Sequence, residues 1–238
     1  MKISLCIPMY NEAPIIESTA KALSKYMEEN FSHCGYEIIF SDDGSRDGCA
    51  ELVNALSLPN VRTVGYPDNR GKGSAVRNAV LSSLGDIVMF TDADLAYGTE
   101  AVKTMTEALD KAPDASVAIG SRNLSKDGYE GYTPIRKLAS KVYIKVLCLA
   151  GGFKLSDSQC GCKAYRGEAA RRIFKCCKVD GFAFDFETIL RAQKEGMKII
   201  EVPVKIVNHR ESKVNVLRDT FKMLGDLRKI KKDIKKEK

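Results

Sequence analysis

The sequence predicts an α/β protein with a mostly parallel sheet flanked by helices, and two observations support this prediction. Short apolar runs alternate with helical patterns through residues 1–120, and the runs are continuous, as in strands that are buried on both faces. Polar clusters directly follow four of these runs. Because ligands of such sheets bind beyond the carboxyl ends of the strands, the four clusters predict a single site.

The first half of the chain is expected to hold five strands and four helices. The apolar runs place the strands at 3–8, 36–41, 61–66, 86–91 and 116–120. The helical patterns between them lie at about 14–30, 47–57, 72–84 and 99–112. Pro14 suits the first turn of the first helix, where a missing N–H costs nothing. Asp47 and Thr99 are candidate capping residues for the second and fourth helices.

The alternation loosens after residue 120, but no linker or change in composition appears, so residues 1–213 are expected to form one domain. NLSKDGYEGYTP reads as a loop before a helix at about 134–150, and FAFDFE leads a helix to about residue 195. MKIIEVPVKI is expected to be a strand that Pro203 restricts to a sheet edge. Residues 214–238 are expected to form a basic, amphipathic helical extension.

Composition and charge limit the possible functions. The chain has 238 residues, and no stretch reaches the roughly 18 apolar residues of a membrane-spanning helix. We also find no signal peptide, so a cytoplasmic chain is expected, and the eight cysteines are expected to be reduced thiols. The net charge is +7, but no aromatic-rich basic patch accompanies it, so a nucleic-acid partner is not expected.

The C-terminal segment carries much of this charge. From Asp226 onward it holds seven Lys and Arg residues against three acids. Apolar residues recur in it at three- and four-residue intervals, at Leu217, Phe221, Leu224, Leu227, Ile230 and Ile234. A basic amphipathic helix is typical of a membrane-surface element. A frayed, solvated helix is the alternative.

Several nucleotide and hydrolase motifs are absent. GKGSAV fails the dinucleotide pattern at its last glycine, the P-loop spacing is not met, and two histidines leave no credible Ser-His-Asp set. What remains is a group of aspartates at the expected strand ends, namely Asp42, Asp43, Asp47, Asp92 and Asp94. Carboxylates without imidazole or thiolate spacing suit Mg²⁺ or Mn²⁺, shared with phosphate oxygens of a substrate. The alternative for TDADLA is a turn with solvated aspartates.

The motifs together resemble those of family-2 glycosyltransferases, which implies a GT-A fold. IPMYNE, SDDGSRD, NRGKGSAVRNA, TDADLA and GSRN stand in the order and spacing of that family. DSQCGCKAYR, FAFDFE, EVPVKI and a late SK before a helix resemble its dolichyl-phosphate β-glucosyltransferase and polyprenyl-phosphate glycosyltransferase branch. The resemblance implies an enzyme that moves a hexose from a UDP-sugar to a polyprenyl phosphate, inverting the anomeric carbon.

The resemblance also implies roles for individual residues. The uracil and ribose are expected to contact Pro8, Tyr10, Glu12 and Asp42, with Asp43, the NRGKG loop and Lys72 completing the pocket. Asp94 is expected to ligate Mg²⁺ or Mn²⁺ directly, with Asp92 against the metal or the ribose. Arg122, Asp157 and Gln159 are expected to border the sugar and the acceptor phosphate, and with Asp94 they are the catalytic candidates. Arg136, Arg210 and Lys213 are candidates for the acceptor phosphate, with a plain surface charge as the alternative for each basic residue.

The acceptor decides whether the reaction needs a base. An alcohol must lose its proton, and Asp157 is then the nearest candidate general base. A polyprenyl monophosphate has its second pKa near 6, so it is already an anionic nucleophile at neutral pH. The alternative functions are transfer to a hydroxyl of a cell-surface glycan and a non-catalytic binding role on the same scaffold.

A lipid acceptor implies contact with a membrane. The helix at 133–150 and the tail could lie together on the cytoplasmic face, although relatives often carry transmembrane segments and this chain does not match that pattern. An oligomer is left open. Ala96 stands where mannose-transferring relatives typically have a glutamine that can ligate the metal. Its lack of a ligand atom predicts weak metal binding without donor and favours a UDP-hexose, glucose above all.

Overall fold

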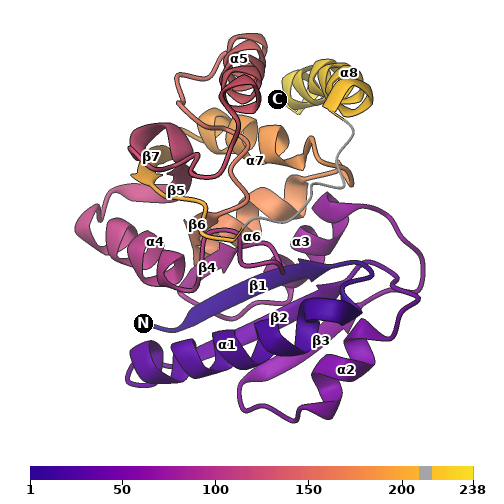
Figure 1. Ribbon diagram of the computed structural model, residues 1–238. Helices are drawn as coiled ribbons and strands as arrows, with labels where there is room; N and C mark the ends of the chain where they lie inside the picture. Colours follow the sequence, from indigo (N-terminus) through magenta and orange to yellow (C-terminus); the bar gives the residue numbers. More distant parts are fainter. Residues whose placement is uncertain (209–215, 238) are drawn as a thin grey trace.

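The structure is a computed structural model that describes residues 1–208 and 216–237. Within these residues, seven strands form one sheet in the order β3-β2-β1-β4-β6-β5-β7 (Figure 1). The strands are β1 (Ile3–Met9), β2 (Tyr36–Asp42), β3 (Val61–Gly65), β4 (Ile87–Phe90), β5 (Ala115–Ser121), β6 (Lys163–Arg166) and β7 (Lys198–Pro203). β6 runs antiparallel to both of its neighbours, and the other pairs are parallel.

Helices cover both faces of the sheet. They are α1 (Ala13–Phe31), α2 (Cys49–Ala55), α3 (Lys72–Leu81), α4 (Glu100–Lys111), α5 (Pro134–Gly151), α6 (Gly167–Cys176), α7 (Phe184–Lys194) and α8 (Val216–Lys236), with a 3₁₀ turn η1 (Arg122–Leu124). Because successive strand side chains point to opposite faces, the side chains of β1 contribute to two hydrophobic cores, one on each face of the sheet. Leu5 and Ile7 pack with α1, α2 and α4, whereas Cys6 packs with residues of the opposite face.

The elements predicted for the first half are confirmed to within a few residues, apart from the two caps. Pro14 lies in the first turn of α1, and Asp47 accepts hydrogen bonds from the amides of Ala13 at 2.8 Å and Cys49 at 3.2 Å. Asp47 thus bonds to the first residue of both α1 and α2, but Gly48 and not Asp47 stands at the N-cap position of α2. Thr99 stands at the N-cap position of α4, but its side chain makes no capping hydrogen bond.

The second half contains elements that the sequence pattern did not predict. β6 is only four residues long and reads KAYR, so it shows neither an apolar run nor an alternating pattern. It forms because β4 and β5 pair with it on both sides. β7 lies at the edge of the sheet and ends at Pro203, as predicted from that proline.

The C-terminal helix α8 packs against α5 and α7 (Figure 1). Its side chains Met223, Leu227 and Ile230 are buried in the core, so this part of its apolar stripe faces the protein. At its end, Glu237 accepts hydrogen bonds from Arg191, the nearest at 2.8 Å. That bond leads the interactions that lower the pKa of Glu237 to about 2, and it holds the end of the tail on α7.

Two further expectations concern the whole chain. All eight cysteines are free thiols, as predicted, and six of them are buried. Among the described residues, no helix combines the length and the hydropathy that crossing a membrane requires.

The sheet brings one set of segments to a single edge. Pairing of Phe90 with Lys163 places the start of β6 beside the end of β4, and pairing of Ser121 with Pro203 brings the ends of β5 and β7 together. The ends of β1, β2 and β3 lie at this edge as well, because these strands run parallel to β4.

Candidate active site

A loop after β3 is built around the buried carboxylate of Asp43. The side chain is only 3% exposed, and its two oxygens accept hydrogen bonds from Tyr66 Oη (2.6 Å), Asn69 Nδ2 (2.9 Å) and the amides of Arg70 and Gly71 (2.9 Å each). Four donors satisfy most of the acceptor capacity of one carboxylate. Asp43 therefore fixes the conformation of the predicted nucleotide loop through these hydrogen bonds.

The end of β1 and the end of β2 are tied together beside this loop. Asp42 Oδ1 accepts from the amide of Ser45 at 3.0 Å, and the amide of Asn11 donates to Ser45 Oγ at 2.9 Å. Tyr10 is 40% exposed at the tip of β1, and Pro8 is buried within that strand. Glu12 is the N-cap residue of α1. The predicted uracil and ribose residues thus all lie at adjoining strand ends.

Asp92 follows β4 and is already paired. Its Oδ1 forms an ion pair with the ammonium of Lys72, at the start of α3, and its Oδ2 lies against the backbone of Gly161. Burial alone would lower the pKa of Lys72, but Asp92, Asp185 and Asp94 outweigh burial and raise it. Lys72 therefore stays charged and neutralises part of the aspartate cluster.

Asp94 lies in a strained turn. Its Oδ1 accepts from the amide of Ala96 at 3.0 Å, and Leu95 between them has φ +50°, a left-handed conformation that a leucine rarely adopts. Such a residue costs about 1–2 kcal/mol unless the surroundings impose it. Here the amide of Val207 donates to the carbonyl of Ala96 at 2.8 Å, and Asn208 Nδ2 donates to that of Leu95 at 2.9 Å. Segment 207–208 thereby fixes the turn that carries Asp94.

The aspartates fit a divalent metal that is shared with a phosphate ligand. In the described part of the chain, no group of three or more His, Cys, Asp or Glu side chains could hold a metal by itself. A hard cation such as Mg²⁺ usually takes one or two carboxylates and fills its other positions with water and phosphate oxygens. Asp92 and Asp94 both lie after β4, so either carboxylate can supply the one or two protein ligands that such a cation needs.

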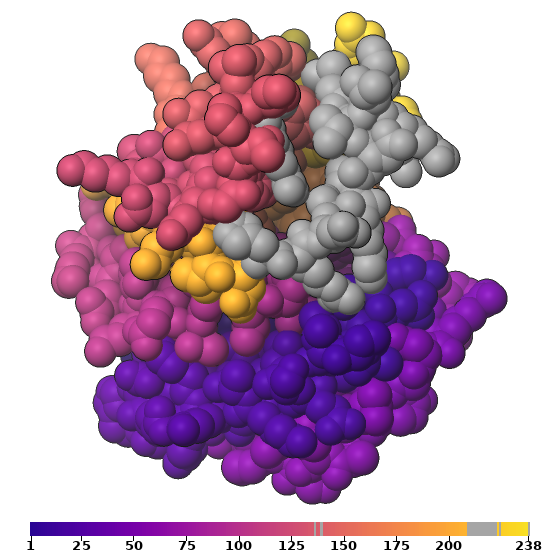
Figure 2. Space-filling view, in the orientation of Figure 1, coloured from indigo at the N-terminus to yellow at the C-terminus, as the bar shows by residue number. Residues whose placement is uncertain are grey.

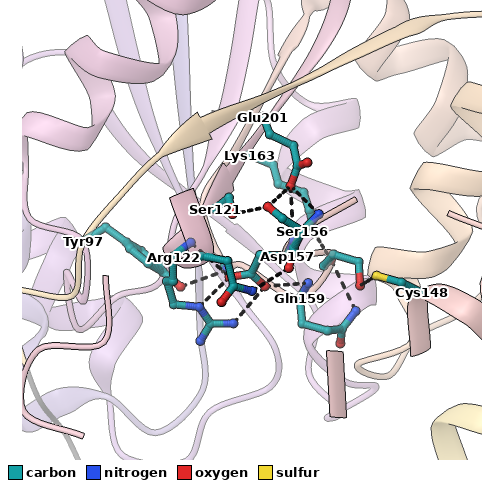
Figure 3. Close-up of polar contacts among 12 residues, drawn as sticks. Tyr97, Ser121, Arg122, Cys148, Ser156, Asp157, Gln159, Lys163 and Glu201 are labelled. Carbon is teal, nitrogen blue, oxygen red and sulfur yellow. Dashed lines mark hydrogen bonds and ion pairs between the residues drawn. The ribbon is translucent and has the colours of Figure 1, made fainter. Parts of the chain in front are cut away.

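Arg122 and Asp157 form a rigid pair just after the end of β5 (Figure 3). Arg122 Nε donates to Oδ2 at 2.6 Å and Nη2 to Oδ1 at 3.0 Å, and the amides of Arg122 (3.2 Å) and Gln159 (3.3 Å) also donate to this carboxylate. Asp157 is 0% exposed, and the Tyr129 ring lies 5.3 Å from the guanidinium carbon of Arg122. The guanidinium is therefore fixed in place by a buried counter-charge.

A second carboxylate, Glu201 of β7, holds the turn that carries Asp157. Its Oε1 accepts from the amide of Ser156 at 2.8 Å, from Ser156 Oγ at 2.6 Å and from the amide of Asp157 at 3.2 Å (Figure 3). Ser156 Oγ also meets Ser121 Oγ at 2.6 Å, which joins the turn to the end of β5. Three segments far apart in the sequence thus position a single guanidinium.

Lys163 and Asp185 form a buried ion pair behind the site. Lys163 is 0% exposed at the start of β6, and its ammonium also donates to the carbonyl of Ser158 at 3.2 Å. Asp185 lies in the first turn of α7. Removing one member of such a pair costs about 3–5 kcal/mol, because the other charge stays buried without a partner. The pair anchors the segment from Ser156 to Gly161 to α7.

Most of the predicted site residues therefore lie at this edge of the sheet, where they form two groups. One group includes Asp42, Asp92, Asp94 and Lys72, and the other includes Arg122, Asp157 and Gln159. Arg210 and Lys213 lie outside the described residues, and so does the side chain of Arg136.

Sequence reasoning missed Glu201, Ser156, Lys163 and Asp185. The available signal was weak, because Glu201 lies in EVPVKI and Asp185 in FAFDFE, and neither segment could be placed at this edge without knowledge of β6 and the pairing of β7.

Gly161 allows the turn to pass over Asp92, which predicts a large effect of a small substitution. A Cβ at this position would overlap Asp92 Oδ2. We expect Gly161→Ala to displace the carboxylate and to lower kcat/KM by about tenfold or more, because a shift of about 1 Å can cost that much. Gly225→Ala is the matched control, since a Cβ there meets nothing within 4 Å. Equal activity of the two variants would contradict this account.

Comparison with known proteins gives consistent matches. Residues 4–174 match the family model described as Glycosyl transferase family 2. A dolichyl-phosphate beta-glucosyltransferase of Dictyostelium discoideum is 30% identical, and the alignment covers 96% of this chain and 73% of the relative. One from Trichomonas vaginalis is 32% identical over 88% of this chain. The chain spans 65% of the length of that relative.

Solved structures show the same fold at low sequence identity. Glucosyl-3-phosphoglycerate synthase from Mycobacterium tuberculosis, in a complex with Mn²⁺, UDP and glucosyl-3-phosphoglycerate, has a TM-score of 0.70 at 18% identity and covers 98% of this chain and 79% of its own. Mannosyl-3-phosphoglycerate synthase from Rubrobacter xylanophilus has a TM-score of 0.69 at 19% identity. The alignment covers 100% of this chain and 75% of the synthase. The predicted GT-A fold is thereby confirmed.

Proposed function

Because the chain belongs to family 2 of the glycosyl transferases, we propose that it transfers a hexose, glucose by preference, from a UDP-sugar to a polyprenyl phosphate. The observation that carries the choice of acceptor is the state of Asp157. Its carboxylate is fully buried, and both of its oxygens accept hydrogen bonds from Arg122. Asp157 is therefore poorly suited to take a proton from an alcohol. The sequence alone had left open whether Asp157 acts as a general base.

On the donor side, we assign the diphosphate to the strand-end aspartates. Asp94 would hold a divalent metal together with the diphosphate, and the metal would supply Lewis-acid charge for the departing UDP. Lys72 keeps Asp92 paired and adds a fixed positive charge near the same phosphates. The loop that Asp43 organises and the tips of β1 and β2 surround the uridine.

On the acceptor side, Arg122 binds the acceptor phosphate. A phosphomonoester with a second pKa near 6 is mostly dianionic at neutral pH, so it attacks without a base. The site must provide a positive group at a fixed position. The guanidinium of Arg122, which Asp157 holds in place, is such a group. Direct displacement from the face opposite UDP inverts the anomeric carbon. Asp157 then acts as a positioning residue.

We propose that residues 1–213 carry catalysis at the cytoplasmic face of a membrane and that residues 214–238 attach to this body. The packing of α8 on α5 and α7 supports an attached extension. Its exposed residues Arg228, Lys229, Lys232, Lys235 and Lys236 would add positive charge toward anionic lipid.

A radiolabelled-sugar assay tests the reaction. The full chain is incubated with labelled UDP-glucose, Mg²⁺ and dolichyl or undecaprenyl phosphate in detergent, and the lipid extract is counted. Parallel reactions use UDP-galactose, UDP-N-acetylglucosamine and GDP-mannose, and further ones replace the lipid by hydroxyl acceptors. We expect labelled lipid with UDP-glucose. Turnover on a hydroxyl acceptor with no labelled lipid would overturn the proposal.

The small side chain of Ala96 predicts how the metal binds. Since Ala96 offers no ligand atom, Mn²⁺ should bind the bare protein weakly and bind in the presence of UDP at least tenfold more tightly. Paramagnetic enhancement of water relaxation measures both affinities. Ala96→Gln should strengthen binding without UDP, whereas Ala108→Gln on α4 is a control away from the turn. Tight binding of Mn²⁺ to the wild-type protein without UDP would contradict this prediction.

A further inference from the structure

Helix α5 carries an apolar stripe that nothing in the described structure covers. Five residues of this stripe are between 45% and 82% exposed, namely Ile135, Leu138, Val142, Val146 and Leu149. At 3.6 residues per turn they fall on one side of the helix, and at about 1.5 Å per residue they extend over roughly 20 Å. Scattered exposed apolar residues are normal, but a row along one helix marks an interaction site.

The other sides of α5 are already occupied. Ile144 and Leu147 lie on the side opposite the stripe and are buried in the core. On one flank α8 packs against the helix, where Tyr143 Oη donates to Met223 Sδ at 3.0 Å and Lys231 Nζ donates to the carbonyl of Ala150 at 2.6 Å. A surface helix is normally polar opposite its buried side. The outer side of α5 is apolar instead, so folding of this chain does not account for it.

The remaining flank is basic. Lys141 and Lys145 are exposed on this flank, whereas Lys137 turns inward with its ammonium 6.0 Å from the centre of the buried Tyr129 ring. The helix contains no Asp or Glu. Lys141 and Lys145 also line a pocket of about 380 Å³ whose wall continues to Asn123 and Ser156, the neighbours of Arg122 and Asp157. An apolar row flanked by lysines matches an anionic bilayer, in which the row enters the acyl region and the lysine stems reach up to the headgroups.

A second copy of the chain fits this face less well. It would bring its own basic α5 against this one, with no carboxylate on either helix to offset the lysines. Among the α8 side chains that the structure describes, Met223, Leu227 and Ile230 are buried, so these three do not compete as the apolar contact. Both helices lie at one end of the molecule, and α5 is on the surface there (Figures 1 and 2).

We therefore propose that the outer side of α5 is a membrane-docking surface for anionic bilayers, with the stripe inserted and Lys141 and Lys145 at the headgroups. This inference rests on the proposed function in placing the protein at a membrane, and it deepens that proposal by naming the surface that binds the bilayer in the absence of donor and acceptor. It also orients the molecule, since the pocket beside Lys141 would then open at the membrane surface next to the Arg122–Asp157 pair.

Vesicle binding of the full chain tests the proposal. The vesicles are equimolar phosphatidylcholine and phosphatidylglycerol, and pure phosphatidylcholine is the comparison. We expect co-sedimentation with the anionic vesicles that weakens at high salt. Leu138→Asp should lower the partition coefficient at least tenfold. Leu84→Asp is the matched control, because Leu84 is 72% exposed and Leu138 is 65% exposed. Equal binding of the two variants would overturn the proposal.

A fluorescence experiment locates the inserted surface. The chain has no tryptophan, so Val146→Trp introduces a single probe on the stripe and Leu84→Trp one away from it. Brominated lipid should quench the first probe and leave the second unchanged. Oligomeric state is followed by light scattering, and a dimer that Leu138→Asp dissociates, with vesicle binding unaffected, would overturn the proposal in favour of a subunit interface.

The reaction is assayed separately, with a short water-soluble prenyl phosphate. Leu138→Asp, which does not alter the lining of the pocket beside Lys141, should transfer glucose to this acceptor at the wild-type rate and lose rate only on vesicle-embedded lipid. If the wild-type protein binds anionic vesicles but transfers no sugar to any prenyl phosphate, the docking surface stands and the proposed function fails. If it transfers sugar to the soluble acceptor but does not bind vesicles, the docking surface fails alone.

Discussion

Asp157→Asn is expected to lower kcat/KM by about 100-fold, the usual effect of losing a fixed charged group at a reacting centre. The buried carboxylate holds Arg122 through two hydrogen bonds, and the guanidinium side chain is itself only 11% exposed. An asparagine offers one acceptor oxygen, so the guanidinium is left partly unpaired in a buried position. The free energy of unfolding should therefore also fall, by about 3 kcal/mol as measured in urea.

The comparison that identifies the role of Asp157 is a double variant. If Asp157 acts only through Arg122, Arg122→Ala with Asp157→Asn should be no slower than Arg122→Ala alone. The pH profile gives a second readout. The acid limb of kcat/KM should lie near pH 6 in both wild type and Asp157→Asn, because it belongs to the acceptor phosphate. If Asp157 is a general base instead, the variant will lose that limb.

The sequence predicted the parallel half of the sheet well because its evidence there is local. β1, β2 and β4 are continuous apolar runs, and each is followed by its polar cluster. The carboxyl ends of parallel strands must meet at one edge, so the clustering of the aspartates followed from the strands alone, whereas their roles toward a donor came from the resemblance.

The acceptor side could not be predicted in the same way, because its residues are placed by long-range pairing. β6 reads KAYR and is stabilised by β4 and β5, so no local pattern indicates it. Without β6 there is no reason to bring Ser156 beside Glu201 or Lys163 beside Asp185. The resemblance supplied Arg122 and Asp157 as separate candidates, and only the structure shows them as one pair.

The apolar stripe of α8 shows a different limit of sequence reasoning. Its three- and four-residue spacing predicts an amphipathic helix equally well whether the apolar side meets lipid or protein. Met223, Leu227 and Ile230 are buried in this structure, whereas α5 has the apolar row that stays exposed. Periodicity identifies a helix with a preferred side, and the rest of the fold decides which partner covers it.

Asp94→Asn is expected to lower kcat by about 10²–10³-fold without a matching loss of stability, because the amide oxygen can still accept from the Ala96 amide. The same five aspartates that look alike in the sequence differ in the structure, since Asp43 is buried in its loop and Asp47 bonds to the first amides of two helices. Asp47→Ala is therefore the matched opposite, expected to cost about 0.5–2 kcal/mol of stability while the activity of the folded protein is kept. Urea unfolding and UDP release in the presence of Mn²⁺ measure the two effects. If both variants lose stability and activity together, the metal is not held chiefly by Asp94. All five aspartates lie near a strand end, so position alone does not distinguish them. If one variant loses activity and the other loses stability, Asp94 differs from its neighbours in what its carboxylate binds.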